Sequence, residues 1–375
     1  MAGQREFLKI AKTIVIKVGS RTLTHKNGKI NYHMLEKIVR EMADLANQGR
    51  HPVLVSSGAG AAGIGRLGLS AKPRTIPEKQ AVAAVGQGLL IHMYEKFFAE
   101  YGHIAAQVLL TRDDFNDRKR YLNSRNTLET LLRYGVIPVV NENDTVAVEE
   151  IVFGDNDTLS ALVAGVLDAD LLILLSDIDG LYTANPKEDP EAKLIATVEQ
   201  VTPEIRKYAG QTSEELATGG MITKLLAAEI STRSGIPMII APGRENNVLQ
   251  RLLDGEEIGT LFCARDKGLD SRKRWIAFGQ AAHGRLIVDR GACKAILEEG
   301  KSLLPSGVID VIGNFVQGDM VAIEDEDGHE LARGLVNFSS KEMKLIKRLR
   351  TDEAAKVLQR PCTEAVHRNN MVVTG

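Results

Sequence analysis

The chain has 375 residues, of which 44% are hydrophobic and 26% are charged, and its formal net charge is −2. This length predicts about two domains, the composition is that of an ordinary soluble protein, and the charge argues against a dedicated nucleic-acid or membrane-surface protein. Three scattered cysteines have neither metal-site spacing nor a disulfide framework. The sequence contains no apolar signal core and no membrane-spanning run, so we expect a cytoplasmic protein without a membrane partner.

Short apolar runs alternate with helical patterns over the first two thirds of the chain. Strands are predicted at 13–18, 51–55, 105–110, 136–140, 171–175 and 237–240, and a helix at 31–48 ends before Gly49. Such alternation is typical of a parallel sheet covered on both faces. The predicted fold class is therefore α/β: a three-layer αβα sandwich with a mainly parallel open sheet.

A charged segment at 264–274 interrupts this pattern and has the composition of a linker. Beyond it, strand candidates at 284–289, 308–312 and 320–324 are short and separated by Gly and acidic turns, which predicts a small, mainly β domain. We expect domains over residues 1–265 and 280–375, joined by a linker over 266–279. From residue 276 onward there are 13 Lys+Arg and 14 Asp+Glu, a net charge of −1.

Two polar clusters lie within 17 residues of each other, Asn-Glu-Asn-Asp at 141–144 and Gly-Asp-Asn-Asp at 154–157. The first follows the strand at 136–140, and the second precedes a helical pattern that begins at Thr158, with Asp157 as the predicted N-cap. Binding sites of α/β folds lie at such strand ends and helix starts. Turn and cap chemistry explains each residue singly, but two clusters so close together favour a binding site.

A glycine-rich segment follows the strand at 51–55. Gly58, Gly60 and Gly63 match the G-x-G-x-x-G dinucleotide motif. The ribose-binding acid should close a second strand about 20 residues later, but the chain there runs through Pro73 and Pro77 into a small-residue helix. We interpret these glycines as allowing a helix and a strand to approach closely. A nicotinamide-dependent dehydrogenase is the alternative that this motif leaves open.

Two lysines occupy positions that call for an anion. Lys224 lies in the first turn of a helix opened by Gly219 and Gly220, where free N–H groups and the helix dipole favour an anion such as phosphate. A solvated surface lysine is the alternative. Lys17 lies within the apolar strand at 13–18 and needs a partner unless an edge strand lets it reach water, while Gly19 gives a ligand close access to the backbone. Together with the polar clusters, this pattern indicates an ATP-dependent phosphotransferase.

Five segments in this order resemble the glutamate 5-kinases of the amino acid kinase family: Ile-Lys-Val-Gly-Ser at 16–20, Val-Ser-Ser-Gly-Ala at 55–59, Val-Asn-Glu-Asn-Asp at 140–144, Gly-Asp-Asn-Asp at 154–157 and Thr-Gly-Gly-Met-x-Thr-Lys at 218–224. The resemblance covers essentially the whole chain, because bacterial members also carry a C-terminal PUA domain. It implies the amino acid kinase fold and ATP-dependent phosphorylation of the L-glutamate side-chain carboxylate to L-glutamate 5-phosphate, the first step of proline biosynthesis. It also implies Mg²⁺, feedback inhibition by proline, and a homo-oligomer, either dimer or tetramer.

The resemblance implies roles for individual residues. Lys17 would contact the ATP phosphates, Lys224 would stabilise the transferred phosphoryl group, and Asp157 would hold both lysines. Glutamate would be bound by Ser57, Asp144 and Asn156. ATP would be bound by Lys17, Ser176, Asp177, Thr218, Gly219, Gly220, Met221, Ile222, Thr223 and Lys224. Ser176 departs from the Thr that the family often has, and no protein ligand of Mg²⁺ is implied.

The chemistry of the reaction agrees with these residue types. The γ-carboxylate of glutamate has a pKa near ~4.3 and is ionised at neutral pH, so it needs no general base. Phosphoryl transfer to it depends on positioning and on charge stabilisation. RNA binding by the PUA-like part is an alternative function, which its net charge of −1 does not favour.

Overall fold

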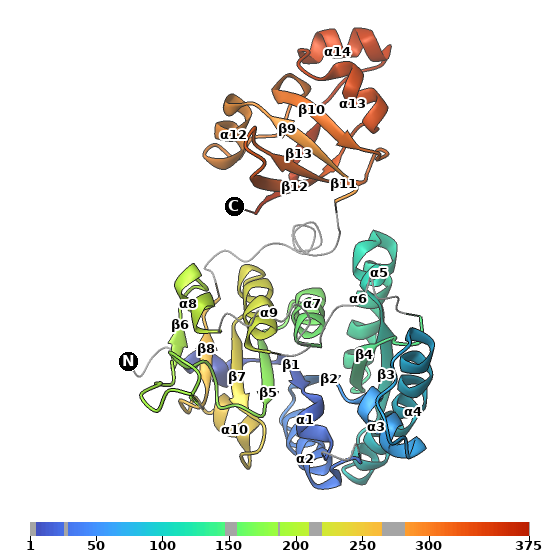
Figure 1. Cartoon of the computed structure of the whole chain (residues 1–375), viewed down its shortest axis with the longest axis vertical. Coiled ribbons are helices and arrows are strands. Elements are labelled where there is room, and N and C mark those ends of the chain that lie inside the picture. The colour runs from blue at the N-terminus through green and yellow to red at the C-terminus, as the bar shows by residue number, and fades with distance from the viewer. Residues whose placement is uncertain are drawn as a thin grey trace. The chain divides into compact units, whose positions relative to one another are not determined.

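Figure 1 shows a computed structural model of the chain, which describes residues 5–25, 29–146, 156–186, 188–209, 220–264 and 282–374. The chain divides into two compact units. One consists of Met1–Asp114 with Lys119–Gly268, and the other of Phe115–Arg118 with Leu269–Gly375. The predicted linker at 266–279 lies outside the described residues.

The first unit is built from strands and helices that alternate along the chain. Its strands are β1 (Thr13–Val18), β2 (His51–Ser56), β3 (Ala105–Leu110), β4 (Ile137–Glu142), β5 (Leu171–Ser176), β6 (Thr197–Val198), β7 (Met238–Pro242) and β8 (Thr260–Phe262). Its helices include η1 (Glu6–Ile10), α1 (Ser20–Leu23), α2 (Tyr32–Asn47), α3 (Ala59–Leu67), α4 (Ile76–Glu100), α5 (Arg112–Asn116), α6 (Arg118–Arg133), α7 (Asn156–Leu167), α8 (Pro203–Tyr208), α9 (Met221–Arg233) and α10 (Val248–Leu253). Residues 115–118, at the end of α5 and the start of α6, are grouped with the second unit.

The eight strands form one sheet in the order β3-β4-β2-β1-β5-β7-β8-β6. All neighbouring pairs are parallel except β7 and β8, which are antiparallel. The predicted mainly parallel open sheet is therefore confirmed, and each of the six predicted strands is present with ends within two residues of the prediction. β6 and β8 were not predicted, because two and three residues are too few to show a strand period.

The central strand β1 shows how the sequence places side chains on the two faces of this sheet. Ile14, Ile16 and Val18 are fully buried in the core that α2, α4 and α10 cover. Each such side chain contributes about 1.5–3 kcal/mol by burial. Because side chains alternate across a strand, Val15 and Lys17 point to the opposite face, where α7 packs on β1 beside α9 (Figure 1).

The glycines of the G-x-G-x-x-G segment shape the junction of β2, α3 and α4. Gly58 lies directly before α3 and has a backbone φ of 104°. Residues with a side chain rarely adopt this conformation, whereas glycine does so readily. A Cβ at Gly63 would lie 1.9 Å from the carbonyl oxygen of Val82, and one at Gly86 would lie 1.7 Å from that of Ala59. The expected close approach is thus present, but it joins two helices rather than a helix and a strand.

The second unit has its own sheet and its own core. Its strands are β9 (Gly284–Val288), β10 (Val308–Gly313), β11 (Met320–Glu324), β12 (Glu330–Val336) and β13 (Val366–Val373), in the order β10-β9-β11-β12-β13. Its helices are α12 (Arg290–Leu297), η2 (Pro305–Gly307), α13 (Ser340–Ile346) and α14 (Thr351–Leu358). A separate cluster of buried apolar side chains fills it, so the predicted small, mainly β domain is confirmed. Among the described residues of both units, no helix is both long and apolar enough to cross a membrane.

Candidate active site

The carboxyl ends of four adjacent strands, β4, β2, β1 and β5, meet at one edge of the large sheet. A cavity of about 270 Å³ lies there, as expected for an open parallel sheet. It is lined by Lys17, Gly19, Ser20, Arg21, Thr22, Ser57, Gly58, Ala59, Gly60, Asn141, Glu142, Asp144, Asn156, Leu175, Ser176, Asp177 and Lys224. The structure therefore brings together residues from all of the described segments that the sequence singled out.

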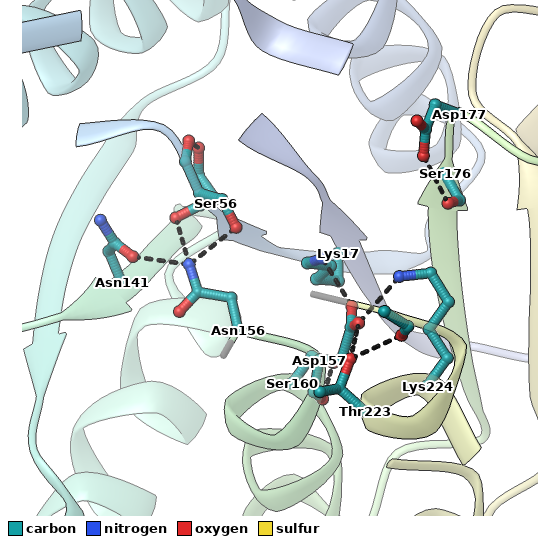
Figure 2. A network of polar contacts seen from close by, with 12 residues as sticks. Lys17, Ser56, Asn141, Asn156, Asp157, Ser160, Ser176, Asp177, Thr223 and Lys224 are labelled. Atoms are coloured by element: carbon teal, nitrogen blue, oxygen red, sulfur yellow. Dashed lines mark hydrogen bonds and ion pairs between the residues drawn. The ribbon is translucent and has the colours of Figure 1, made fainter. Parts of the chain in front are cut away.

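At one side of this cavity, two lysines converge on a single carboxylate (Figure 2). Lys17 Nζ lies 2.5 Å from Asp157 Oδ1, and Lys224 Nζ lies 2.9 Å from Asp157 Oδ2. The Thr223 hydroxyl lies 3.1 Å from the same Oδ2 and 2.8 Å from the carbonyl oxygen of Gly220. The lysines come from β1 and α9 and the aspartate from α7, so three separate elements fix the group.

These three charges are almost completely removed from water. Lys17 is 7% exposed, Lys224 is 6% exposed and Asp157 is fully buried. Burial alone would raise the pKa of Asp157, but the ammonium groups of Lys17 and Lys224 outweigh it and hold that pKa below its ordinary value. Two cations share one anion, so this group of three side chains has one positive charge in excess. The alternative of a solvated surface lysine at 224 is therefore wrong.

The prediction that Asp157 is an N-cap is also wrong. Asp157 is the second residue of the described part of α7, and its carboxylate is taken by the lysines and Thr223. Asp is common both as a cap and as an ion-pair partner, and the local sequence does not distinguish the two. The partners that decide are 67 and 140 positions away in the chain.

The opposite side of the cavity is an amide and hydroxyl network. The Asn156 Nδ2 group lies 2.9 Å from Ser57 Oγ, 2.8 Å from Asn141 Oδ1 and 3.0 Å from the carbonyl oxygen of Ser56 (Figure 2). Asn141 Nδ2 in turn donates to Gln87 Oε1 at 2.7 Å. The side-chain N–H groups of Asn156 are used within the protein. Its side-chain oxygen Oδ1 is therefore the atom that can accept a hydrogen bond from a ligand.

Two residues of this network were not predicted, and both come from α4. Gln87 supports Asn141, while the buried Tyr94 hydroxyl lies 2.8 Å from Ser56 Oγ. Burial raises the pKa of Tyr94, so this phenol stays protonated. The sequence signal for Gln87 was a polar side chain between Gly86 and Gly88 in an otherwise small and apolar stretch.

Acidic side chains line the cavity at the ends of β4 and β5. Burial raises the pKa of Asp144, which follows β4. Asp177 follows β5, and its carboxylate lies 3.4 Å from Arg21 Nη1 and 3.3 Å from Ser176 Oγ. Burial would raise the pKa of Asp177 as well, but its own backbone N–H and the Arg21 guanidinium lower it. The pKa of Asp144 is therefore raised above the ordinary carboxyl value, whereas that of Asp177 is lowered below it.

The second glycine motif is described from residue 220 onward, and Thr218 and Gly219 lie outside the described residues. Gly220 precedes α9 in an extended conformation, Met221 begins the helix, and the side chain of Ile222 is exposed. Lys224 thus lies in the first turn of a 13-residue helix, as predicted.

Comparison with known proteins identifies the class to which this fold and this site belong. Residues 12–242 match the amino acid kinase family, and residues 284–358 match the PUA domain. The first match covers more than half of the chain, so the protein belongs to the amino acid kinase family.

Curated relatives narrow this assignment. The chain is 56% identical to glutamate 5-kinase from Moorella thermoacetica over 97% of both chains. It is 54% identical to glutamate 5-kinase from a Thermoanaerobacter species, over 96% of this chain and 97% of the relative. It is 52% identical to glutamate 5-kinase from Carboxydothermus hydrogenoformans, over 98% of this chain and 99% of the relative. The resemblance to the glutamate 5-kinases is confirmed.

Proposed function

We propose that this protein transfers the γ-phosphoryl group of ATP to the side-chain carboxylate of L-glutamate, giving ADP and L-glutamate 5-phosphate. The observation that carries the proposal is the pair of buried lysines on Asp157 beside a cavity at the carboxyl edge of the sheet. The relatives that match nearly the full length of this chain are themselves named glutamate 5-kinase, which supports the proposal. The product would be the first intermediate of proline biosynthesis from glutamate.

Lys17 and Lys224 supply the charge stabilisation that this reaction needs. An oxygen of the ionised γ-carboxylate attacks the γ-phosphorus, and the bond from that phosphorus to the β–γ bridging oxygen breaks. Negative charge then spreads over the transferring group and the leaving ADP. Ammonium groups fixed before the reaction begins stabilise that charge without reorganisation. Asp157 orients both lysines, so it acts by positioning rather than by accepting a proton.

The amino acid end of glutamate is assigned to the network on the other side of the cavity. The carbonyl oxygen of Asn156 and the carboxylate of Asp144 suit the α-ammonium group, because both are acceptors. Ser57 Oγ, which already accepts from Asn156, has a hydroxyl hydrogen to give to the α-carboxylate. Glutamate would then lie with its γ-carboxylate toward the lysines.

ATP is assigned to the side of the cavity formed by the ends of β1 and β5 and the start of α9. Lys17 would contact the phosphates, and Ser176 and Asp177 would face the ribose or base. The segment Thr218, Gly219, Gly220, Met221, Ile222 and Thr223 would line the nucleotide up to Lys224. Free backbone N–H groups at the start of α9 suit a phosphate.

Mg²⁺ is expected as a companion of the nucleotide. Asp157 does not fit as its ligand, since both of its oxygens are used by cationic or hydroxyl groups. Phosphate oxygens and water are the usual partners of this ion. When bound, it neutralises phosphate charge, and the roles of the protein side chains do not depend on a protein ligand for it.

Proline is proposed as a feedback inhibitor at the amino acid end of the same cavity. It shares the α-carboxylate and a cationic α-nitrogen with glutamate, but it has no γ-carboxylate. Asp144 and Asn156 would serve both ligands, whereas Lys17 and Lys224 would serve glutamate alone.

A coupled assay of ADP release tests the proposed reaction. Glutamate, aspartate and acetylglutamate are compared at equal concentration, with hydroxylamine added to trap the acyl phosphate as a hydroxamate. We expect ADP and hydroxamate to form in equal amounts with glutamate and far more slowly with the other two. Equal rates with aspartate or acetylglutamate, or ADP release without hydroxamate, would refute the proposal.

A further inference from the structure

Helix α2 carries a third buried lysine of the described part of the chain, Lys37, which the proposed mechanism does not use. Lys37 and Glu41 lie one helical turn apart, are 1% and 5% exposed, and bring Nζ to 3.4 Å from Oε1. Burial lowers the pKa of Lys37, and the neighbouring carboxylate of Glu41 opposes this effect. The cost of desolvation means that such a buried pair contributes little net stability. The role of this pair is therefore inferred from its hydrogen bonds, which show which segment it holds in place.

Those hydrogen bonds go to the connection between β7 and α10. Lys37 Nζ donates to the carbonyl oxygen of Gly243 at 2.9 Å. The two carboxylate oxygens of Glu41 accept the backbone N–H groups of Asn247 and Leu249 at 2.9 and 3.0 Å. The pair therefore fixes both ends of the segment 243–249.

Gly243 connects this segment to the wall of the active-site cavity. Its N–H donates to the carbonyl oxygen of Ser176 at 2.8 Å. A Cβ at this position would lie 3.3 Å from both Leu175 Cβ and Thr22 Cγ2, and 3.4 Å from the Ser176 oxygen. Leu175, Ser176 and Thr22 all line the cavity. A shift of Gly243 would thus directly displace three residues that line the cavity.

We propose that Lys37 and Glu41 are positioning residues for the nucleotide side of the cavity. They hold Gly243, and through it the end of β5 that carries Ser176 and Asp177. This inference rests on the proposed function, in which that strand end faces ATP. The glutamate side is supported by other contacts, those of Asn156 with Ser57 and Asn141.

The test compares Lys37→Met with Arg5→Met in the full-length protein. Methionine keeps an apolar chain of similar length but leaves the Gly243 oxygen without its donor. We expect the KM for ATP to rise about tenfold and ADP binding to weaken equally, with the KM for glutamate changed less than about twofold. Arg5 is the matched control: it is 6% exposed and donates to the carbonyl oxygens of Ala196, Glu256 and Ile258, which do not line the cavity. Arg5→Met should lower the melting temperature without separating the two KM values.

Gly243→Ala is a second variant, which keeps the buried charges and presses on the cavity wall instead. It should also raise the KM for ATP selectively, and it decides the question if Lys37→Met does not fold. A folded Lys37→Met protein whose two KM values are unchanged, or rise together, would overturn the inference. The same holds if Arg5→Met shows the same selective rise. ADP titration of parent and variants needs no glutamate, so a wrong assignment of the substrate would not disguise either result.

Discussion

Lys17 of β1 and Lys224 of α9 are held on the two oxygens of one carboxylate, at 2.5 and 2.9 Å. Two ammonium groups that share one carboxylate repel each other, and two like unit charges about 4 Å apart do so by roughly 1–4 kcal/mol, depending on the local dielectric. Asp157 offsets that repulsion and leaves one unit of positive charge in excess. The pair is therefore prepared for an anion before any ligand binds.

The first prediction concerns the two lysines. Lys17→Ala and Lys224→Ala should each lower kcat by roughly 10²–10³-fold, because in the proposed reaction each would remove a fixed donor to the phosphate groups of ATP. Circular dichroism should show a retained fold. Lys9→Ala is the control, since Lys9 is an exposed lysine paired only with Glu6 among the contacts described, and its kcat should not change. Normal turnover in folded Lys224→Ala would exclude its assigned role.

The second prediction concerns pH and Asp157. The lysines lower the folded-state pKa of this carboxyl below its ordinary value of 3.8. Its contribution to the free energy of unfolding is therefore complete above 3.8 and is lost as the pH falls through the lower folded-state pKa. Asp157→Asn should cost about 3–5 kcal/mol at neutral pH, because it leaves buried cations unpaired.

Urea unfolding of parent and Asp157→Asn from pH 7 downward measures this difference. The difference in free energy of unfolding between the two proteins should stay constant as the pH is lowered to about 4 and should decrease below that pH. A difference in unfolding free energy that instead widens as the pH falls from 7 to 5 would mean that the pKa of Asp157 is raised rather than lowered.

The sequence was informative where a local pattern carries the information. The apolar run of β1 indicated that Lys17 lies in a buried strand and needs a partner, and the glycines before α9 indicated that Lys224 lies at a helix start. The identity of the partner could not be read from either segment. Asp157 is joined to both lysines only by the parallel pairing of β1 with its neighbours and the packing of α7 on α9.

The roles of Gln87 and of the Lys37–Glu41 pair could not be predicted from any local sequence pattern. A glutamine on a helix, or a lysine and a glutamate one turn apart, is ordinary on a solvated face. Their roles depend on Asn141 and on Gly243, which other strands bring within hydrogen-bonding distance. Tertiary contacts of this kind have no period and no composition signal.

The third prediction tests the structural explanation of the G-x-G-x-x-G segment. Gly63→Ala and Gly86→Ala each place a Cβ less than 2 Å from a carbonyl oxygen of the other helix. We expect a loss of about 1–3 kcal/mol or more in the free energy of unfolding from such overpacking. Gly88→Ala is the control in α4, because a Cβ there meets no atom within 4 Å. It should be neutral or stabilising by about 0.5–1 kcal/mol. Equal stability of Gly63→Ala and Gly88→Ala would contradict the packing role.

The fourth prediction concerns domain independence. The two units have separate buried cores, and the cavity residues all belong to the first unit. We propose that a chain ending at residue 265 folds and still releases ADP with glutamate. Its kcat should lie within a few-fold of the full-length value, measured beside its melting curve. Loss of activity in a folded truncated chain would show that the catalytic unit extends further.

The last prediction concerns Asp144, which we assign to the ammonium group shared by glutamate and proline. A desolvated charge pair there would be worth more than an exposed one. Asp144→Ala should therefore raise the KM for glutamate and weaken proline inhibition by similar factors, whereas Lys224→Ala should leave proline binding nearly unchanged. Burial raises the pKa of Asp144, so in the parent the affinity for both ligands should begin to fall while the pH is still above the ordinary carboxyl value of 3.8. Calorimetric titration of proline against both variants, beside glutamate kinetics over the same pH range, measures each effect. Tight proline binding by an Asp144→Ala protein that has lost glutamate would show that the two ligands occupy separate sites.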